Sequence, residues 1–417
     1  MLPEHWKHMP LHTVAEVRTG LAKGKPALID PVEVPYLRVA NVQDGHFDLG
    51  EIKTILVERS AIKRYQLHAG DVLMTEGGDF DKLGRGAVWS GEISPCLHQN
   101  HLFVVRPDSS VLNAIFLAAL SSSHYGRAYF ESCAKRSTNL ASINSSQLKE
   151  FPVVLPPYSE QAQIACILDT WDAAIATTKQ LLANSRRQMR DLMQGLLTGH
   201  RTFGTDCTLW AHADFDQVFE RVTRKNTAGD QNVLTISGQH GLISQREYFS
   251  RVVASDDLSG YTHLSTGDFA YNKSSSNGYP MGAIKPLVAY DSGVVSSLYI
   301  CFRIRPGVEA DEDFFSHYFD AGMLNDEITG IAQEGARNHG LLNVSVKEFF
   351  KLKLRVPPLE DQRRIAEVLN TAQEEIRNIE GQLERLKTEK RALMADLLTG
   401  KRRVRVPDTT EEAQEPA

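Results

Sequence analysis

LPPYSEQAQIACIL at residues 155–168 returns 201 positions later as VPPLEDQRRIAEVL at residues 356–369. The Pro-Pro pair, the glutamine and the Ile-Ala pair fall on identical residues in the two copies. The same offset places LLTG at 196–199 on LLTG at 397–400. Chance does not give so many coincidences at one offset, so we interpret the chain as an internal duplication.

Each copy predicts one long helix. The Pro-Pro pair blocks helix upstream, the acids Glu160 and Asp361 suit the positive end of a helix dipole, and Gly199 and Gly400 stand where a helix ends. Each helix then has roughly 38 residues and a length of roughly 57 Å. Two ordinary core helices of separate domains are the alternative, but such helices average about a dozen residues.

The apolar residues within each helix recur at alternating steps of four and three, which is the seam of a coiled coil. We expect the two helices to pair in an antiparallel arrangement, with the polar seam positions Thr178, Ser185 and Lys390 helping to set the register. The predicted seam consists of Ile164, Leu168, Trp171, Ile175, Leu182, Met189, Leu192 and Leu196 in the first helix and Ile365, Leu369, Ile376, Ile379, Leu383, Leu386, Leu393 and Leu397 in the second.

The segments before the two helices correspond more weakly. Residues 67–73 match residues 264–270, Arg85-Gly-Ala-Val88 matches Met281-Gly-Ala-Ile284, and Val105-Arg-Pro107 matches Ile304-Arg-Pro306. Short β-rich runs separated by Gly, Asp, Asn and Ser predict mixed α/β modules with irregular antiparallel sheets. The predicted fold is therefore mixed α/β (α+β): two modules separated by a two-helix antiparallel coiled coil, with an internal pseudo-two-fold duplication. The predicted segments are a module at 1–154, a helix at 155–205, a module at 206–355, a helix at 356–405 and a disordered acidic tail at 406–417.

The composition indicates a globular protein of the cytoplasm. Of 417 residues, 42% are apolar and 24% are charged, and we find neither a leader nor a membrane-spanning run. The five cysteines lie apart, which predicts reduced thiols.

The net charge of −6 counts against a polyanion ligand. However, four of the acids lie in the last ten residues, so the remainder is nearly neutral.

The loops that differ between the modules carry the side chains that grip phosphates and read base edges. Any surface loop favours such residues, so the repeated arrangement supports the set rather than any one member. The candidate DNA contacts in the first module are Lys23, Lys25, Arg38, Asn41, Lys82, Arg85, Lys135, Arg136, Ser137 and Thr138. Those in the second are Arg224, Lys225, Ser237, Gln239, His240, Lys273, Ser274, Asn277, Tyr279, Arg337, Asn338 and His339.

Catalytic motifs are incomplete. Residues 20–26 resemble a phosphate-binding loop but are one residue short and end in proline. Residues 155–158 resemble the Asn-Pro-Pro-Tyr tetrapeptide of amino-methyltransferases, but leucine replaces the amide that must contact the target base. His98 and His101 lie three apart without further ligands, which favours surface or core histidines over a metal site. We therefore expect no catalytic residue, metal or cofactor in this chain.

The doubled pattern resembles the specificity subunit of a type I restriction-modification enzyme. The residues that carry the resemblance are 155–165 with 196–199 and 356–366 with 397–400, and it extends over nearly the whole chain. Lys149-Glu-Phe151 and Lys347-Glu-Phe349 stand upstream, as they do in that family. The modules would then be target-recognition domains, but the loops match only in general character, so no base contact carries over.

The resemblance implies a protein of a prokaryotic cytoplasm that binds double-stranded DNA at a split target, one half-site per module. The helices would space the half-sites and dock two methyltransferase (modification) subunits. Those subunits would supply S-adenosylmethionine chemistry, while separate restriction (motor-nuclease) subunits would use ATP and magnesium. Two alternatives remain: a scaffold that joins two protein-binding modules, and a nuclease that uses Asp30, Glu51 and Lys53.

Overall fold

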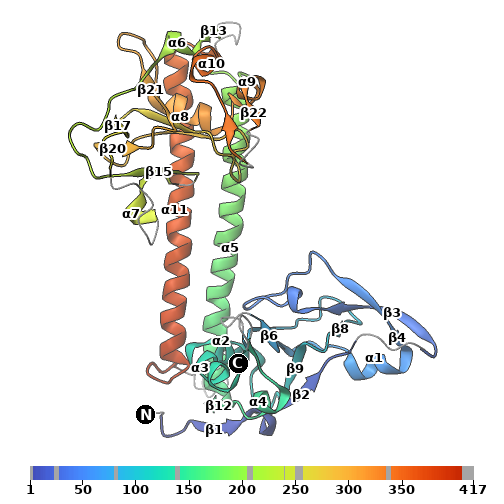
Figure 1. Cartoon of the computed structure of the whole chain (residues 1–417). Coiled ribbons are helices and arrows are strands. Elements are labelled where there is room, and N and C mark those ends of the chain that lie inside the picture. Colours follow the sequence, from blue (N-terminus) through green and yellow to red (C-terminus); the bar gives the residue numbers. More distant parts are fainter. Residues whose placement is uncertain are drawn as a thin grey trace, which may run out of the picture. The chain divides into compact units, whose positions relative to one another are not determined.

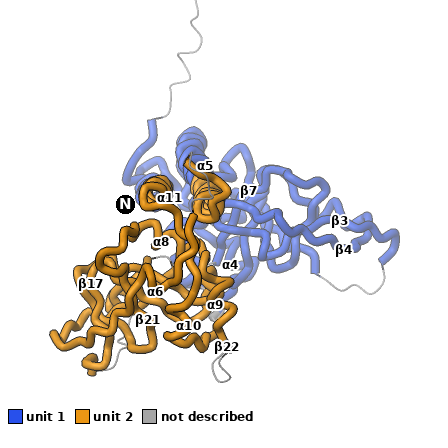
Figure 2. The backbone as a smooth tube through the Cα atoms, turned by 90° about the horizontal axis from the view of Figure 1, so that it is seen from above, with its two compact units in different colours: residues 1–179, 382–417 blue, residues 180–381 orange. Residues whose placement is uncertain are grey.

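The computed structural model describes residues 3–22, 28–78, 83–136, 141–203, 210–238, 240–248, 257–334 and 340–405. The chain divides into two compact units, coloured separately in Figure 2. Unit 1 comprises residues 1–179 and 382–417, and unit 2 comprises residues 180–381. Each unit therefore combines one of the predicted modules with a part of each long helix.

The two long helices are α5 (Tyr158–Leu197, 40 residues) and α11 (Leu359–Leu397, 39 residues) (Figure 1). Both start directly after the Pro-Pro pair; α5 ends two residues before Gly199 and α11 ends three residues before Gly400. Gly199 and Gly400 have φ of 76° and 73°, a conformation that glycine adopts at little cost and that commonly ends a helix. The sequence-based prediction of the helices is confirmed.

Within each unit the two helices run antiparallel. In unit 1, Ile164 and Leu168 share a core with Leu397, and further along α5 Asp172 contacts Lys390. In unit 2, Arg186 Nη2 donates to Glu380 Oε1 at 2.6 Å, and Leu196 shares a core with Ile365. Every predicted seam residue is buried or partly buried, so the four-three spacing marks the contact face of this helix pair.

Each unit contains a four-stranded antiparallel sheet with the same strand order. The order in unit 1 is β2-β9-β5-β7 and the order in unit 2 is β14-β21-β18-β19, so the duplication extends to the modules. The strands of unit 1 are β2 (Ala15–Thr19), β9 (Leu102–Pro107), β5 (Val72–Thr75) and β7 (Gly86–Val88). Those of unit 2 are β14 (Phe219–Arg221), β21 (Ile300–Ile304), β18 (Phe269–Asn272) and β19 (Ala283–Pro286).

The sheet register corrects two of the sequence matches between modules. Val72 pairs with Val88 and Val105, whereas Phe269 pairs with Pro286 and Phe302. The sequence matches paired residue 106 with 305 and residue 86 with 282. The register instead pairs residue 106 with 303 and residue 84 with 282, so each sequence match was wrong by two residues. Residues two apart lie on the same face of a strand, so alternating patterns cannot detect such a slip.

Two helices pack beside each sheet. In unit 1, α2 (Ala114–Ser122) packs on β5 and β7 and is followed by α3 (His124–Cys133). In unit 2, α8 (Glu312–Asp320) packs on β19 and is followed by α9 (Asn325–Ile331). Large buried side chains fill the space between these layers, with Phe103, Phe116 and Phe130 in unit 1 and Phe219, Phe269 and Phe302 in unit 2.

Each unit also has strands outside the main sheet. A strand near the start of each module pairs with the strand that leads into the long helix: β1 (Lys7–Pro10) with β12 (Pro152–Leu155), and β13 (Ala211–Asp214) with β24 (Lys353–Val356). Unit 1 adds a sheet of β4 (Lys53–Glu58), β3 (Pro31–Leu37) and β8 (Leu97–His98) next to α1 (Arg59–Tyr65). Unit 2 adds the pairs β15 (Leu234–Ser237) with β16 (Gly241–Ser244) and β17 (Thr262–Ser265) with β20 (Ser292–Val295), and the helix α7 (Gln245–Tyr248).

The remaining elements are short. They comprise the 3-10 turns η1 (Leu11–Thr13) and η2 (Val39–Asn41) and the helices α4 (Ser145–Lys149), α6 (Phe215–Val218) and α10 (Val346–Phe349). The two-residue strands are β6 (Gly77–Gly78), β10 (Lys135–Arg136), β11 (Ala141–Ser142), β22 (Gln333–Glu334) and β23 (Leu342–Asn343). The structure thus confirms the mixed α/β fold with open antiparallel sheets and a long helix pair.

Candidate nucleic-acid interface

The repeated glutamine attaches each module to its long helix. Gln161 is fully buried; its Oε1 accepts from the backbone N–H of Asn113 and its Nε2 donates to the carbonyls of Val111 and Pro156, each at 2.9 Å. Asn113 is the N-cap residue of α2. The glutamine therefore links the start of the long helix to the start of the helix that packs on the sheet.

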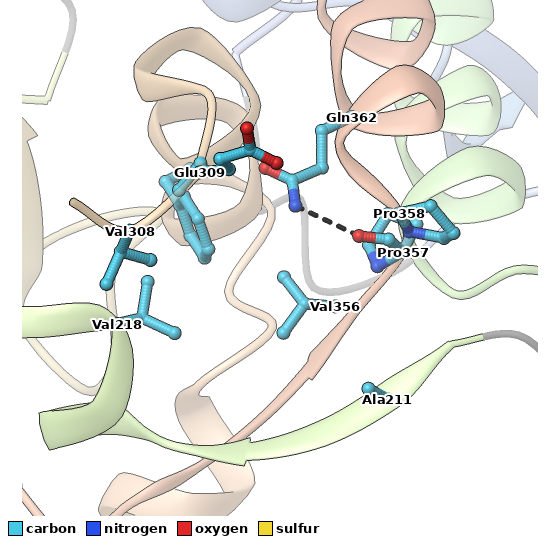
Figure 3. A pocket seen from close by; sticks show the side chains of 10 residues that line it. Ala211, Val218, Val308, Glu309, Val356, Pro357, Pro358 and Gln362 are labelled. Atoms are coloured by element: carbon cyan, nitrogen blue, oxygen red, sulfur yellow. Dashed lines mark hydrogen bonds between the residues drawn. The ribbon is translucent and has the colours of Figure 1, made fainter.

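Gln362 makes the corresponding link in unit 2. Its Oε1 accepts from the backbone N–H of Asp311, the N-cap residue of α8, and its Nε2 donates to Pro357 O, both at 2.9 Å. Figure 3 shows this amide beside a pocket of about 210 Å³. Counted from the two N-caps, Ala310 in the pocket wall takes the place of Leu112, which is buried in unit 1. The side chain at this position of the junction is therefore smaller in unit 2 than in unit 1.

The chain that follows α11 packs back onto the junction of unit 1. The Arg403 guanidinium binds the carboxylate of Glu160, which also accepts from Trp6 Nε1 at 3.3 Å. The Glu160 side chain is only 9% exposed. A Cβ added to Gly400 would lie 2.6 Å from Pro3 Cγ, so this approach requires glycine. Residues from both ends of the described chain therefore hold the start of α5.

The repeated Gly-Asp pair shapes the entry to the central strand. Gly70 and Gly267 have φ of 89° and 86°. The aspartate that follows accepts from a backbone N–H three residues back, at 2.7 Å from His68 N to Asp71 and at 2.8 Å from Ser265 N to Asp268. The repeated motif is thus a turn that starts β5 and β18.

The same two aspartates bind arginines, and sequence analysis missed this arrangement. Arg106 binds Asp71 through two bonds of 2.6 and 2.8 Å, and the hydrogen bond to Asp71 raises the pKa of Arg106 above its ordinary value. In unit 2, Asp268 binds Arg224, and burial raises the pKa of Asp268. Arg224, a predicted DNA contact, therefore already forms an ion pair inside the module.

In unit 2 the structure brings two of the predicted recognition loops together, and residues that follow a third predicted loop lie beside them. Tyr279 Oη donates to Gly238 O at 3.0 Å, which joins the loop after β18 to the turn between β15 and β16. Ser275 N donates to Gly340 O at 2.7 Å and Leu342 N donates to Lys273 O at 3.0 Å. Gly340 and Leu342, which follow α9 in the chain, therefore lie against the loop that follows the central strand.

Unit 1 joins the corresponding two loops through a small sheet in the order β10-β11-β6. Gly77 and Gly78, directly after the central strand, pair with Ser142 and Ala141, which follow α3. A Cβ added to Gly77 would lie 2.7 Å from Ala141 O, so glycine permits this close pairing. In each unit we take the described residues of these two loops as the candidate nucleic-acid interface: 76–78 and 83–85 with 134–136 and 141–142 in unit 1, and 273–282 with 332–334 and 340–342 in unit 2.

Several predicted contacts remain available at the surface. Lys135 and Asn277 are exposed within these loops, and Lys273 and Ser274 are partly exposed there. Outside the loops, His240 is exposed, and Lys225 Nζ donates to Gly260 O at 2.8 Å while remaining exposed. Tyr279 is partly exposed, but its hydroxyl is used within the unit.

Two predicted contacts are corrected because their polar atoms are used inside the modules. Asn41 is 3% exposed; its Nδ2 donates to Asp48 O and Glu51 O, at 2.9 and 3.0 Å. Ser237 is 6% exposed and its hydroxyl accepts from His240 N. Both side chains stabilise turns, and we no longer expect them to reach a base.

Arg38 and Arg85 are partly buried. Arg38 Nη2 contacts Glu51, and Arg85 Nη2 donates to Val42 O at 3.4 Å. Nine further predicted contacts lie outside the described residues, and for Arg136 only the backbone is described, in β10. Those nine are Lys23, Lys25, Lys82, Ser137, Thr138, Gln239, Arg337, Asn338 and His339.

Two of the three residues of the nuclease alternative contact each other, and the third binds an arginine. Asp30 Oδ2 accepts from Arg59 Nε at 2.8 Å, and the Glu51 carboxylate lies 3.5 Å from Lys53 Nζ. Nowhere in the described part of the chain do three His, Cys, Asp or Glu residues gather in a way that could hold a metal ion. His101 Nδ1 lies 2.7 Å from Glu76 Oε2.

His98 is a core residue. It is 2% exposed, its Nδ1 lies 3.2 Å from Tyr65 O, and burial lowers its pKa to about 4. The ring is therefore neutral at pH 7, and Nδ1 carries the proton because it faces a carbonyl. Among the helices described, none combines the length and the apolar character that a membrane span needs.

Comparison with known proteins shows which family the chain resembles. The family model described as "Type I restriction modification DNA specificity domain" matches residues 3–184. The putative type I restriction enzyme MjaX specificity subunit of Methanocaldococcus jannaschii is 25% identical, and the alignment covers 97% of this chain and 95% of that protein. Over 97% of its length the chain is therefore similar to a type I restriction-modification specificity subunit, and its first module matches the DNA specificity domain of that family.

Solved structures support the same fold for this chain. It resembles the HsdS subunit of Thermoanaerobacter tengcongensis with a TM-score of 0.50 and 16% identity, covering 96% of this chain and 98% of that one. It also resembles the type I S subunit of M. genitalium with a TM-score of 0.53 and 14% identity, covering 97% of both chains. The family model covers the first module, and the duplication relates the second module to it.

Proposed function

We propose that this specificity subunit reads a bipartite target in double-stranded DNA, with one half-site recognised by each module. The observation that carries the proposal is the repeated framework: the same four-strand order and the same glutamine link to a long helix occur in both units. The loops on this framework differ. Two modules with one framework and different loops suit two different half-sites.

The long helices would act as the spacer. With 40 residues at about 1.5 Å each, α5 is about 60 Å long. Because a DNA turn is about 34–36 Å, a spacer of this length suits half-sites one to two turns apart. Equivalent helix starts in both units favour two equivalent docking partners, which we propose to be methyltransferase subunits, with restriction subunits joining them. S-adenosylmethionine, ATP and magnesium would act on those partners, inside a prokaryotic cell.

Deleting one heptad from each helix tests the spacer. Residues 182–188 of α5 and 376–382 of α11 contain both members of the Arg186–Glu380 pair and can be removed together. Met189 and Leu383 then take the seam positions of Leu182 and Ile376. The helices shorten by about 10 Å, so we expect a gap shorter by about three base pairs and unchanged half-sites, read by sequencing the methylated sites of host cells.

The control variant keeps the length of both helices. The seven residues removed from α5 are reinserted at another place in the seam of α5, and the seven removed from α11 are reinserted at another place in the seam of α11. This variant should retain the wild-type gap. An unchanged gap in the shortened protein would show that the helices do not set the spacing. A change in both half-sequences would contradict the assignment of one half-site to each module.

A scaffold that joins two protein-binding modules is the second candidate, because the net charge is −6. A gel-shift of the chain with its co-purified partners on random duplexes separates the two. Binding that weakens as salt rises indicates phosphate contacts and supports the DNA-reading function. An absence of binding at every salt concentration supports the scaffold.

A further inference from the structure

Unit 2 contains a buried lysine next to its candidate interface. The Lys285 side chain on β19 is 8% exposed. Its Nζ donates to Tyr279 Oη at 2.9 Å, binds the Asp320 carboxylate, and lies 5.0 Å from the centre of the Tyr279 ring. Burial disfavours the charged form, but Asp320 and Tyr279 outweigh it and raise the pKa of Lys285 above its ordinary value. The lysine is therefore a buried cation held by two partners.

The lysine fixes a tyrosine that closes a tight turn. Ser276 and Tyr279 exchange two backbone hydrogen bonds, of 2.9 and 3.1 Å, around Asn277 and Gly278. Gly278 has a φ of 85°, and Asn-Gly is the preferred pair for a two-residue hairpin turn. Asn277 is exposed at the tip. The turn thus presents one amide side chain to solvent.

The tyrosine is also held from its other side. Its hydroxyl donates to Gly238 O at 3.0 Å. A Cβ added to Gly238 would lie 2.8 Å from Tyr279 Cε2, so the ring packs directly on the backbone of that turn. Asp320 is the last residue of α8, which packs on β19. The ring therefore connects the Asn277 turn to a strand, a helix and a second loop.

Unit 1 has no such charged anchor at the equivalent positions. The sheet register pairs Leu73 with Ala87 in unit 1 and Ala270 with Lys285 in unit 2, so Ala87 is the counterpart of Lys285. The helices α2 and α8 have nine residues each, and the counterpart of Asp320 is Ser122. Neither replacement side chain carries a charge. The anchor is therefore a property of the second module alone.

A buried ion pair is a poor source of net stability, since desolvation offsets the attraction, but it can select one conformation. We propose that Lys285 and Asp320 are positioning residues that hold the Ser276–Tyr279 turn in one conformation, so that Asn277 reads a base pair of the second half-site. An asparagine amide can both accept and donate, which matches the major-groove edge of adenine. This inference rests on the proposed function, and it makes Tyr279 an anchor rather than a base contact.

The test replaces the pair by the residues of unit 1. The double variant Lys285→Ala/Asp320→Ser removes both charges together, so neither is left unpaired. The control is Lys351→Ala/Glu348→Ser, which removes an exposed pair of the same unit. The first measurement is amide hydrogen exchange of the purified full chain. We expect exchange at Tyr279 to rise at least tenfold in the double variant and to remain unchanged in the control.

The second measurement is the methylated sequence in host cells that carry each variant. A good bidentate contact contributes about 5- to 150-fold discrimination, so we expect one base pair of one half-site to become degenerate in the double variant and in Asn277→Ala. The other half-site keeps its sequence. Unchanged exchange at Tyr279, or raised exchange with both half-sites intact, would overturn the inference. If the wild-type protein shows no bipartite target, the proposed function itself fails.

Discussion

Replacing Gln161 by methionine tests the link between the first module and its helix. Methionine has a similar volume but makes none of the three bonds at 2.9 Å to Asn113, Val111 and Pro156. A net contribution of about 1 kcal/mol per bond gives a loss of about 3 kcal/mol, and the buried groups left without partners can only increase it. Gln362→Met removes two such bonds, so the expected loss in unit 2 is about 2 kcal/mol.

Calorimetry of the full chain, with hydrogen exchange to assign the transitions, measures both losses. In a unit of this size 1 kcal/mol corresponds to about 2–4 °C, so Gln161→Met should lower the transition of unit 1 by roughly 6–12 °C. The control is Gln180→Met, on an exposed position of α5 with one side-chain bond, which should change the stability by less than about 0.5 kcal/mol. Equal effects of Gln161→Met and Gln180→Met would refute the idea that the repeated glutamine is a structural link.

Three further predictions concern single residues. Burial lowers the pKa of His98 from 6.5 to about 4, so as the pH falls the unfolded state takes up a proton before the folded state does. The free energy of unfolding of unit 1 should therefore fall by roughly 3 kcal/mol between pH 6.5 and pH 4. Denaturant titrations at the two pH values should show a smaller loss for His98→Gln. Arg403→Ala leaves the Glu160 carboxylate buried without its cation and should cost about 2–4 kcal/mol, and adding Glu160→Gln should recover part of this in the same titration. Gly282→Ala places a Cβ 2.3 Å from a backbone oxygen at a φ of 79°. The control Gly229→Ala has a similar φ of 71°, but its Cβ meets nothing within 4 Å, so it measures the strain of a positive φ alone. Gly282→Ala should therefore lower the melting temperature by more than Gly229→Ala does.

The helices were predictable because their signals are local and repeated. Pro-Pro, an acid in the first turn, a four-three seam and a terminal glycine all lie in one stretch of sequence, and each has a direct physical meaning. The sheet order of the modules was not predictable in this way. The short strands β6, β10 and β11 have two residues each, which is too few to show an alternating pattern.

The candidate site was predictable as a set of loops but not residue by residue. Asn41 and Ser237 are of the types that contact DNA, but the same side chains also cap turns by bonding to nearby backbone. Lys285 was missed for the opposite reason. A lysine in a short strand suggests an outward-facing position, and its partner Asp320 lies 35 residues further along the chain.

The last part of the chain completes the unit that the first part begins, and this has a consequence for synthesis of the protein. Unit 2 is one continuous segment, whereas unit 1 needs residues 382–417 in addition to 1–179. At about 5–20 residues per second, roughly 10–45 s separate the emergence of residue 179 from that of Leu397. Throughout that interval Ile164 and Leu168 lack the side chains of α11 that cover them in the finished protein. The second module can therefore be complete on the ribosome while the apolar start of α5 is still exposed and open to chaperones.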